Sequence, residues 1–551
     1  MKKKFIFYSI IFSLIVFSST TAQDTFTRID SILVPEIENC GFGEIVSGVD
    51  FDNDGKLEIY AVNNMHDIGG NEETPRIYKY EYNGTEWELV WDEYSRDIVI
   101  QNSWAGLTWG DWDGDSKNEI IWAPANYLDP STTPPNINPP RILVWEANGD
   151  DKLGKLEFGF EVPNAQWTIT EEENFEVRPV KLKLHDINND GKLELIFADR
   201  ETNYKFGIIS ITDIPDNGNG SETWTMEASG LDVDMGISQI YDLAIVNSTI
   251  YFIHEDGSIT PVRYENESYT IMPNIPNMVP GGSWKTANTV DLDNDGIEEI
   301  VVGGWVTGTG HNKVFLLQED ETEVLKSTMI GDFEPLIGAS GRINGGQDAF
   351  GDIDNDGYLD FIFGTRGATS DGSIIRLEYL GGDITDPISY ETSMVDSLYP
   401  VLNSGRYDVV SVANLDDDPE LEILYTDGNL CIRMPIVILD FNKPVGVEEE
   451  NSLPSEFTLE QNYPNPFNPS TKINYTIPIL KEIGNGTTNI KLKVYDVLGN
   501  EIVTLVNEDQ TPGKYSINFD ATKYNQISSG VYIYKLETSY SSISKKMIVI
   551  K

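Results

Sequence analysis

The chain has 551 residues and a formal net charge of −52 at pH 7, from 38 basic and 90 acidic side chains. A charge of this sign and size repels nucleic acid and anionic lipid surfaces, which leaves cations, neutral polymers and basic proteins as partners. The length excludes one ordinary domain and, in a chain with internal repeats, is compatible with a single repeat fold followed by a smaller domain.

Residues 1–22 have the order of a secretory signal peptide. Three lysines precede an apolar run from Phe5 to Phe17, and small residues follow it. The run is shorter than the roughly 20 residues of a membrane helix, and no later stretch reaches that length. We therefore expect cleavage after Ala22 and no membrane-spanning segment in the mature protein.

Six acidic stretches repeat one pattern along residues 23–440. The first reads DFDNDGKLEIYAV from Asp50, and the others begin at Asp111, Asp186, Asp291, Asp352 and Asn414. In each stretch, oxygen-bearing side chains occupy positions 1, 3, 5 and 9, and apolar sequence typical of a strand follows. A tight turn directs such side chains at one centre together with the carbonyl of position 7, and six to eight oxygens are what Ca²⁺ prefers.

The pattern therefore predicts Ca²⁺ as the cofactor, with up to six ions. The predicted metal-ligating residues, position 7 acting through its backbone carbonyl, are Asp50, Asp52, Asp54, Lys56, Glu58, Asp111, Asp113, Asp115, Lys117, Glu119, Asp186, Asn188, Asp190, Lys192, Glu194, Asp291, Asp293, Asp295, Ile297, Glu299, Asp352, Asp354, Asp356, Tyr358, Asp360, Asn414, Asp416, Asp418, Glu420 and Glu422. We expect weak or no binding in the sixth loop, where Asn414 replaces the first aspartate and Pro419 replaces the turn glycine of position 6.

Other interpretations of the acidic loops are weaker. An EF-hand needs a glutamate at position 12 and flanking helices, whereas position 12 here is apolar or aromatic in all six loops. Loops without an ion would bring 22 carboxylates together with nothing to neutralise them. We expect the ions to be structural, fixing the bends from which buried strands leave.

The spacing of the loops predicts the architecture. The interval between Asp186 and Asp291 is long enough for one more unit, and residues 240–264 contain alternating strands without the acidic cage, beginning near Tyr241. Seven units of about 50 to 75 residues, each with room for four short strands, predict an all-β fold, a seven-bladed β-propeller over residues 23–440. An elongated β-solenoid, with coils of about 20 to 30 residues, is the alternative.

The loops and the strands after them resemble FG-GAP (VCBS-type) repeats, the units of the seven-bladed propeller of integrin α-subunits. The resemblance covers roughly residues 37–440 and is most specific in the loops that begin at Asp50, Asp291 and Asp352. It implies calcium in loops on one face of the disc and, where a ligand is bound, binding on the opposite face. It does not imply a particular ligand, since one fold serves many functions.

The C-terminal part has a different composition. Residues 453–551 contain 10 lysines, 9 acidic residues, no arginine and no tryptophan, and the Pro- and Glu-containing residues 441–455 precede them as a linker. Alternating apolar and polar residues between Gly, Asn and Pro turns predict a small antiparallel β-sandwich over residues 456–551. An ordinary accessory sandwich domain has the same pattern.

Four segments of this region resemble the type A C-terminal sorting domain of the type IX secretion system. They are FTLEQNYPNPFNPSTKINYTIP (457–478), IKLKVYDVLGNEIVTLVN (490–507), SSGVYIYKLET (528–538) and KKMIVIK (545–551). The resemblance implies the outer-membrane secretion machinery as a partner and export through the periplasm and outer membrane. The protein would then be secreted or held at the cell surface.

Cysteine and histidine give little support for catalysis. Cys40 and Cys431 lie near the two ends of the propeller region, and both a disulfide that closes the ring and two separate buried thiols remain open. His66, His185, His254 and His311 have no metal or triad spacing, and no common catalytic motif is present. No catalytic residue is predicted.

The 11 tryptophans lie within residues 87–305. Most, such as Trp109 and Trp122, are expected in the core between blades, whereas Trp284 or Trp305 is a candidate for a sugar-stacking surface.

These observations predict a secreted calcium-binding propeller that acts as a surface or extracellular binding or adhesion module for an unknown glycan or protein ligand. The alternative is an extracellular polysaccharide-degrading enzyme on the same scaffold, with Arg342, Arg366 and Arg406 as candidate residues.

Overall fold

The structure is a computed structural model with two compact units, residues 1–444 and 445–551. It describes residues 25–442 and 458–550, except for 39, 65–73, 96–104, 125–139, 148–151, 158–159, 169–176, 201–204, 216–221, 232–234, 236–237, 306–309, 321–323, 367–372, 398–406, 417, 428–433, 460–461, 463–464, 478–487, 498, 511–512, 525–526 and 539–541. The predicted signal peptide and most of the predicted linker lie outside the described residues.

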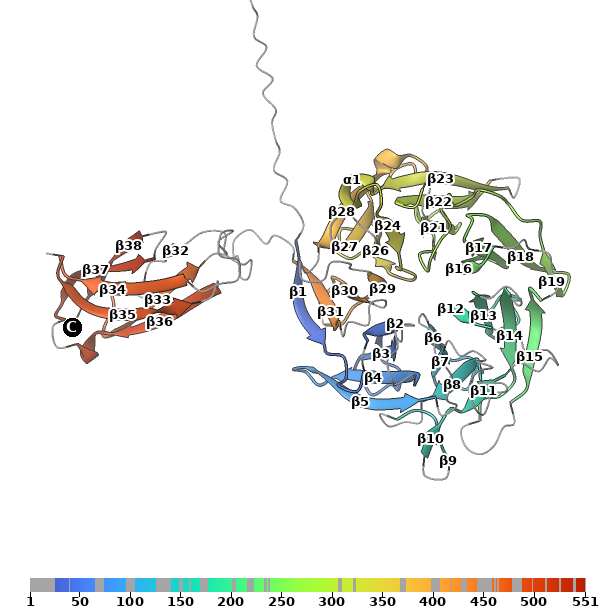
Figure 1. Cartoon of the computed structure of the whole chain (residues 1–551), viewed down its shortest axis with the longest axis horizontal. Helices are drawn as coiled ribbons and strands as arrows, with labels where there is room; N and C mark the ends of the chain where they lie inside the picture. The colour runs from blue at the N-terminus through green and yellow to red at the C-terminus, as the bar shows by residue number, and fades with distance from the viewer. Residues whose placement is uncertain are drawn as a thin grey trace, which may run out of the picture. The chain divides into compact units, whose positions relative to one another are not determined.

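The first unit is a ring of seven antiparallel sheets, here called blades 1 to 7, which follow one another around a common centre (Figure 1). Blade 1 contains β2 (Phe42–Val49), β3 (Glu58–Asn63), β4 (Arg76–Tyr82) and β5 (Trp87–Tyr94); blade 2 contains β6 (Gly106–Gly110), β7 (Glu119–Ala123), β8 (Ile142–Glu146) and β11 (Ala165–Trp167); blade 3 contains β12 (Pro179–His185), β13 (Glu194–Asp199), β14 (Phe206–Ile211) and β15 (Trp224–Ser229). A hairpin of β9 (Lys155–Glu157) and β10 (Phe160–Val162) is inserted in blade 2.

The remaining blades have the same order. Blade 4 contains β16 (Ile240–Val246), β17 (Thr249–His254), β18 (Ile259–Glu265) and β19 (Ser268–Ile271); blade 5 contains β20 (Asn288–Val290), β21 (Glu299–Gly303), β22 (Lys313–Glu319) and β23 (Leu325–Asp332); blade 6 contains β24 (Arg342–Asn344), β25 (Phe350–Gly351), β26 (Asp360–Arg366), β27 (Ser373–Tyr379) and β28 (Tyr390–Ser397); blade 7 contains β29 (Tyr407–Ala413), β30 (Glu422–Asp427), β31 (Ile436–Asn442) and β1 (Thr25–Ile32). Two short helices, α1 (Glu334–Ile337) and η1 (Pro387–Ser389), lie in blades 5 and 6.

The seven-bladed propeller predicted from the sequence is confirmed, including the blade without an acidic loop. In blade 4 the turn between β16 and β17 has only two residues, Asn247 and Ser248, and Asn247 has a φ of 51°. The corresponding connection in blade 1 has eight residues, 50–57. The second strand is buried along its whole length in blades 1 to 5, because each blade packs between two neighbours.

The N-terminal strand closes the ring. β1 pairs antiparallel with β31, from Thr25 opposite Asn442 to Ile32 opposite Ile436, and so supplies the outermost strand of blade 7. Cys40, just after β1, is disulfide-bonded, and the chain has one other cysteine, Cys431, which lies outside the described residues. The sequence predicted that the first and last blades meet but not that one strand is shared between the two ends of the chain.

Two buried ion pairs join separate blades of the ring. Lys285, in the segment before β20, donates to Glu44 of blade 1 at 2.6 Å and to the carbonyl of Ala105 beside blade 2 at 3.1 Å. Lys181 of blade 3 donates to Asp242 of blade 4 at 2.7 Å. These four charged side chains are all buried. The first contact joins the segment before blade 5 to blade 1, and the second joins the neighbouring blades 3 and 4.

The second unit is an antiparallel sandwich, as predicted. One sheet contains β32 (Thr458–Leu459), β33 (Ser470–Ile477) and β36 (Gly513–Asp520); the other contains β35 (Glu501–Gln510), β34 (Thr488–Tyr495), β37 (Gly530–Glu537) and β38 (Ser542–Val549), with η2 (Ala521–Lys523) after β36. Alternate residues such as Ile490, Leu492 and Val494 enter one core. Within the described residues, no helix is long and apolar enough to cross a membrane.

Candidate metal centre

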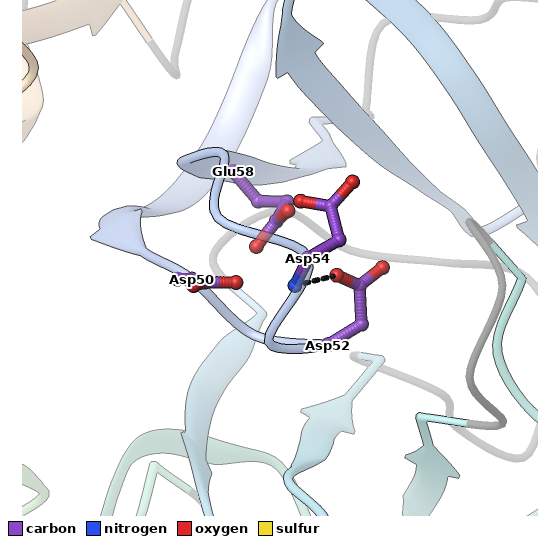
Figure 2. A group of neighbouring side chains, drawn as sticks. All are labelled: Asp50, Asp52, Asp54 and Glu58. Atoms are coloured by element: carbon purple, nitrogen blue, oxygen red, sulfur yellow. Dashed lines mark hydrogen bonds between the residues drawn. The ribbon is translucent and has the colours of Figure 1, made fainter.

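The six acidic loops occupy equivalent places in blades 1, 2, 3, 5, 6 and 7. Each connects the innermost strand of its blade to the second strand, and position 9 is always the first residue of that second strand: Glu58, Glu119, Glu194, Glu299, Asp360 and Glu422. Figure 2 shows the first loop, with the three aspartates spaced around the turn and Glu58 reaching back from β3. Equivalent connections in a ring of blades bring all six loops to the same face of the propeller.

Two positions give each loop its curvature. Position 6 has a left-handed φ between 76° and 96° in the first five loops, at Gly55, Ser116, Gly191, Gly296 and Gly357. Position 4 is also left-handed in these loops, where it is Asn or Gly, the residues that tolerate this region best. The sequence pattern identified the glycine of position 6, but the second left-handed position had not been recognised.

Backbone amides hold the acidic side chains in place. In the first five loops the N–H of position 6 donates to the carboxylate of position 1, at distances of 2.9 to 3.2 Å. In all six loops the N–H of position 7 donates to the carboxylate of position 5, at 2.8 to 3.0 Å. The carboxylates are therefore oriented by the turn itself before any ligand binds.

The position-9 carboxylate is the most buried acidic side chain of each loop. One of its oxygens accepts the N–H of position 2 in all six loops, at 2.5 to 3.1 Å. The other oxygen, Oε1, has no hydrogen-bond partner among the described residues in Glu58, Glu119 and Glu422, and all three side chains are buried. A buried anionic oxygen without a partner is costly unless a cation faces it.

Burial changes the acidity of these groups. Desolvation raises the pKa of Glu119 to about 9 and the pKa values of Glu58, Glu194, Glu299 and Glu422 to about 7, although the backbone N–H lowers each of them. Desolvation also raises the pKa of Asp360 to about 7, against the opposing effect of Arg376. Nearby aspartates of the same loop add to the increase in the glutamates.

The predicted ligands come together in at least four loops. Carboxylate oxygens of Asp50, Asp52, Asp54 and Glu58 lie within 4.8 Å of one another. The aspartates of positions 1, 3 and 5 form similar groups in the second, fourth and fifth loops, which are Asp111, Asp113 and Asp115; Asp291, Asp293 and Asp295; and Asp352, Asp354 and Asp356. Three or four converging carboxylates fit the all-oxygen coordination of Ca²⁺.

Two loops also contact a buried basic side chain, which the sequence analysis did not predict. In blade 1, Lys79 of β4 is 2.8 Å from Asp52 and 3.8 Å from Glu58, and its side chain is fully buried. In blade 6, Arg376 of β27 donates to Asp360 at 2.6 Å and to Asp354 at 2.7 Å. Both residues lie two positions before a glutamate of the third strand, so a Lys or Arg in this place is the sequence signal that was missed.

The third strand also adds an acid beside several loops. Glu81, Glu146 and Glu378 lie directly opposite the position-9 acids Glu58, Glu119 and Asp360. Carboxylate oxygens of Glu146, Asp115 and Glu119 lie within 4.8 Å of one another, and the Lys117 ammonium group is 2.9 Å from Glu146.

The sixth loop is built differently, in agreement with its irregular sequence. The Asn414 side chain donates through Nδ2 to the carbonyl of Asp418 at 2.7 Å and to that of Glu420 at 3.5 Å. Glu420 is the position-7 residue whose carbonyl the sequence assigned to the metal. Pro419 has no N–H to donate to the side chain of position 1, as position 6 does in the other loops. In the sixth loop the Asn414 side-chain amide bonds backbone carbonyls of the loop instead.

The other candidate residues lie elsewhere. Trp122 is buried as expected, but the prediction for Trp109 is wrong because 39% of it is exposed. Trp284 is only 3% exposed and packs against Tyr241 and Trp305 at ring distances of 4.6 and 5.0 Å, which excludes it as an open stacking surface. The reason is that the segment before β20 folds into the centre of the ring.

The remaining polar candidates are arginine and histidine residues. Arg342 and Arg366 lie opposite each other on β24 and β26, whereas Arg406 and His66 lie outside the described residues. Burial lowers the pKa of His185 and of His254, and His254 bonds Thr260 at 2.9 Å. His311 bonds the carbonyl of Ala339 at 2.9 Å. These contacts are those of packing residues.

Several solved structures are similar in fold at low sequence identity. PorZ, a surface component of the type IX secretion system of Porphyromonas gingivalis, is 12% identical with a TM-score of 0.38, over 94% of this chain and 61% of PorZ. The N-terminal domain of Nup170 from Chaetomium thermophilum is 8% identical with a TM-score of 0.42, over 78% and 63% of the two chains. Sqt1 of Saccharomyces cerevisiae is 8% identical with a TM-score of 0.40, over 81% and 96%.

Two sequence families match parts of the chain. Residues 50–122, which contain the first two acidic loops, match the FG-GAP-like repeat, and residues 461–551 match the secretion system C-terminal sorting domain. No curated protein matches the chain. The chain therefore carries an FG-GAP-like repeat region and, after it, a type IX secretion system C-terminal sorting domain, which indicates export across the outer membrane to the cell surface or the medium.

Proposed function

We propose that the protein is a calcium-stabilised β-propeller that acts as a binding or adhesion module outside the cell. Export by the sorting domain places it where free Ca²⁺ is abundant relative to the cytosol. The observation that carries the calcium part is the buried position-9 carboxylate, which uses one oxygen to fix the turn and, in Glu119 and Glu422, leaves Oε1 without a hydrogen-bond partner among the described residues.

The chain supplies each proposed site through a fixed set of groups. Positions 1, 3 and 5 contribute side-chain oxygens, position 7 a carbonyl, and position 9 the carboxylate from the start of the second strand. A bound Ca²⁺ would neutralise these oxygens and fix the angle between the innermost strand and the second strand. The loops in blades 1, 2, 3, 5 and 6 are the proposed sites, and the sixth loop is the weakest.

Calcium binding is tested by calorimetric titration of the metal-free protein and by thermal unfolding in Ca²⁺, in Mg²⁺ and in EGTA. We expect binding at up to five sites and a melting temperature that is several degrees higher in Ca²⁺ than in EGTA, because ligands that bind only the folded state stabilise it. Mg²⁺ should stabilise less, since it requires a stricter octahedron. An unchanged melting temperature in EGTA would contradict the calcium part of the proposal.

The binding role is tested on an array of glycans and extracellular matrix proteins probed with the purified chain. We expect at least one class of ligand to be retained in Ca²⁺ and lost after chelation. Cleavage of an arrayed polysaccharide, rather than retention, would instead favour the enzymatic alternative.

A further inference from the structure

The propeller has a groove at the seam between blade 7 and blade 1. It encloses about 720 Å³ and is lined by residues 30–36, at and after the end of β1, and by Tyr80, Glu86, Trp87 and Leu89 of blade 1. Ile32 and Tyr80 belong to the core between these two blades, and Trp87 packs against that core. The groove forms because β1 ends at Ile32 and the chain then turns towards β2, which leaves the outer end of this core open.

Tyr80 gives the groove an unsatisfied polar group. Its side chain is only 3% exposed, and its hydroxyl has no hydrogen-bond partner among the described residues. Burial, with smaller contributions from Glu38 and Asp92, raises the pKa of this phenol, so it keeps its proton and remains a donor. Buried hydroxyls are normally paired, and a ligand in the groove would supply the missing acceptor.

The walls of the groove combine apolar surface with negative charge. Leu33 is 74% exposed and Leu89 is 44% exposed, with Trp87 partly exposed beside them. Asp30, Glu36 and Glu86 are all exposed at the rim, and the lining contains no Lys, Arg or His. None of these three carboxylates forms an ion pair with the described residues. The charge complements a cationic ligand.

The strands on either side have free edges. β1 and β5 are the outermost strands of their blades, and each pairs with one neighbour, β31 or β4, in the part of the chain that the structure describes. A free strand edge presents N–H and C=O groups to which an extended peptide adds as a further strand. Alternate side chains of such a peptide would point into the groove and towards its rim.

We propose that this groove binds an extended peptide segment of a partner protein in which apolar and basic residues alternate. A peptide carbonyl accepts the hydrogen bond of Tyr80, the apolar side chains pack against Leu33, Trp87 and Leu89, and Lys or Arg side chains pair with Glu36 and Glu86. A neutral glycan lacks the cations that match the three rim carboxylates, and an acidic glycan is repelled by them. The inference rests on the proposed binding role and locates one site for it.

The test uses fluorescence anisotropy with three labelled hexapeptides, in which leucine alternates with lysine, serine or glutamate. We expect the lysine peptide to bind most tightly and to bind more weakly at higher salt. Replacing both rim glutamates, Glu36→Gln and Glu86→Gln, should weaken binding of the lysine peptide about tenfold. Glu88→Gln is the matched control, because Glu88 lies exposed on the same strand β5 and does not line the groove.

Tyr80→Phe separates a ligand contact from a structural role. Because the hydroxyl has no hydrogen-bond partner among the residues that the structure describes, we expect its removal to leave the melting temperature unchanged or higher while it weakens peptide binding about fivefold. A lower melting temperature together with unchanged binding would overturn the assignment of this hydroxyl to a ligand.

Two further outcomes would overturn the inference. The first is equal affinity for the three peptides. The second is that the protein binds a neutral chito-oligosaccharide probe and not the lysine peptide, and that Tyr80→Phe reduces the binding of this oligosaccharide. Neither result contradicts calcium stabilisation, which is read from melting temperatures in EGTA, or a binding role at another site, which is read from the array. Failure here is therefore distinguishable from failure of the proposed function.

Discussion

At the scale of single residues, the acidic loops depend on a few special conformations and on one buried carboxyl group. The left-handed positions 4 and 6 turn the chain so that the aspartates share one side, and the position-9 acid fixes position 2 through its N–H. Ser116 and Glu119, both in the second loop, test these two features separately.

Ser116 is the one non-glycine residue at position 6 among the left-handed examples, with a φ of 76°. A side chain in this region costs roughly 1–2 kcal/mol, and glycine removes that cost while it adds freedom to the unfolded chain. We expect Ser116→Gly to stabilise the propeller by about 0.5 to 1 kcal/mol, measured by urea unfolding. Gly296→Ala, at the same position of the fourth loop and with a φ of 88°, is the reverse control and should destabilise it.

Glu119→Gln should have different effects with and without calcium. The pKa of Glu119 is raised to about 9 by burial, so at pH 7 without metal the group is protonated, and an amide oxygen still accepts the N–H of Trp112. We therefore expect little change in the melting temperature in EGTA. In Ca²⁺ the variant should lack the stabilisation from one site, and calorimetry should detect one fewer ion; the same number of ions as in the wild type would contradict the role of Glu119.

At the scale of elements, the third strand of blades 1 and 6 brings a basic side chain to the acidic loop of the same blade. β4 and β27 bring Lys79 and Arg376 to positions 3 and 9 of their loops, whereas the residues of β8 and β14 at the same register, Val144 and Ile208, are apolar. The first and fifth loops thus contain a built-in positive charge. We expect them to depend less on calcium for their conformation than the second and third loops.

Lys79→Met tests this internal cation. It leaves Asp52 and Glu58 buried without their partner, and breaking a buried pair by removing one member costs about 3–5 kcal/mol. We expect a loss of this order in EGTA and a smaller loss in Ca²⁺, because the metal then neutralises the same carboxylates. The control is Lys326→Met, whose side chain is 55% exposed where it pairs with Asp320, so its effect should be well under 1 kcal/mol. Equal effects of the two variants would contradict the prediction.

At the scale of the whole molecule, the raised pKa values couple stability to pH. Five position-9 acids have pKa values of about 7, and Glu119 has a value of about 9, against roughly 4.5 for glutamate and 3.8 for aspartate in the unfolded chain. Between these values the folded state binds more protons than the unfolded state, so the free energy of unfolding falls as the pH rises.

The expected result is a calcium-free propeller whose urea midpoint declines from about pH 5 to about pH 7. In saturating Ca²⁺ the decline should largely disappear, because the metal stabilises the ionised carboxylates and returns their pKa values below this window. The measurement is a series of urea titrations in EGTA and in Ca²⁺ at several pH values. Parallel curves for the two conditions would show that the buried acids are not the groups that calcium contacts.

The sequence by itself determined the repeat, the all-β class and the number of blades. These follow from local patterns, since the acids at positions 1, 3, 5 and 9 and the apolar strands after them recur in every blade except the fourth. It also determined the sorting domain, whose turns and alternation are local. The irregular sixth loop was recognisable because Asn414 and Pro419 change the atoms available for hydrogen bonding.

Only the tertiary structure decided which distant residues meet. The pairing of β1 with β31, the contact of Lys285 with Glu44, and the approach of Lys79 and Arg376 to the acidic loops join segments far apart in sequence or on neighbouring strands. The burial of Trp284 and the exposure of Trp109 have the same origin. The local sequence pattern determines which side of a strand is apolar, whereas closure of the ring determines which residues cover that side. For this reason the groove between blades 7 and 1 and the contacts of Lys79 and Arg376 could be found only in the folded molecule.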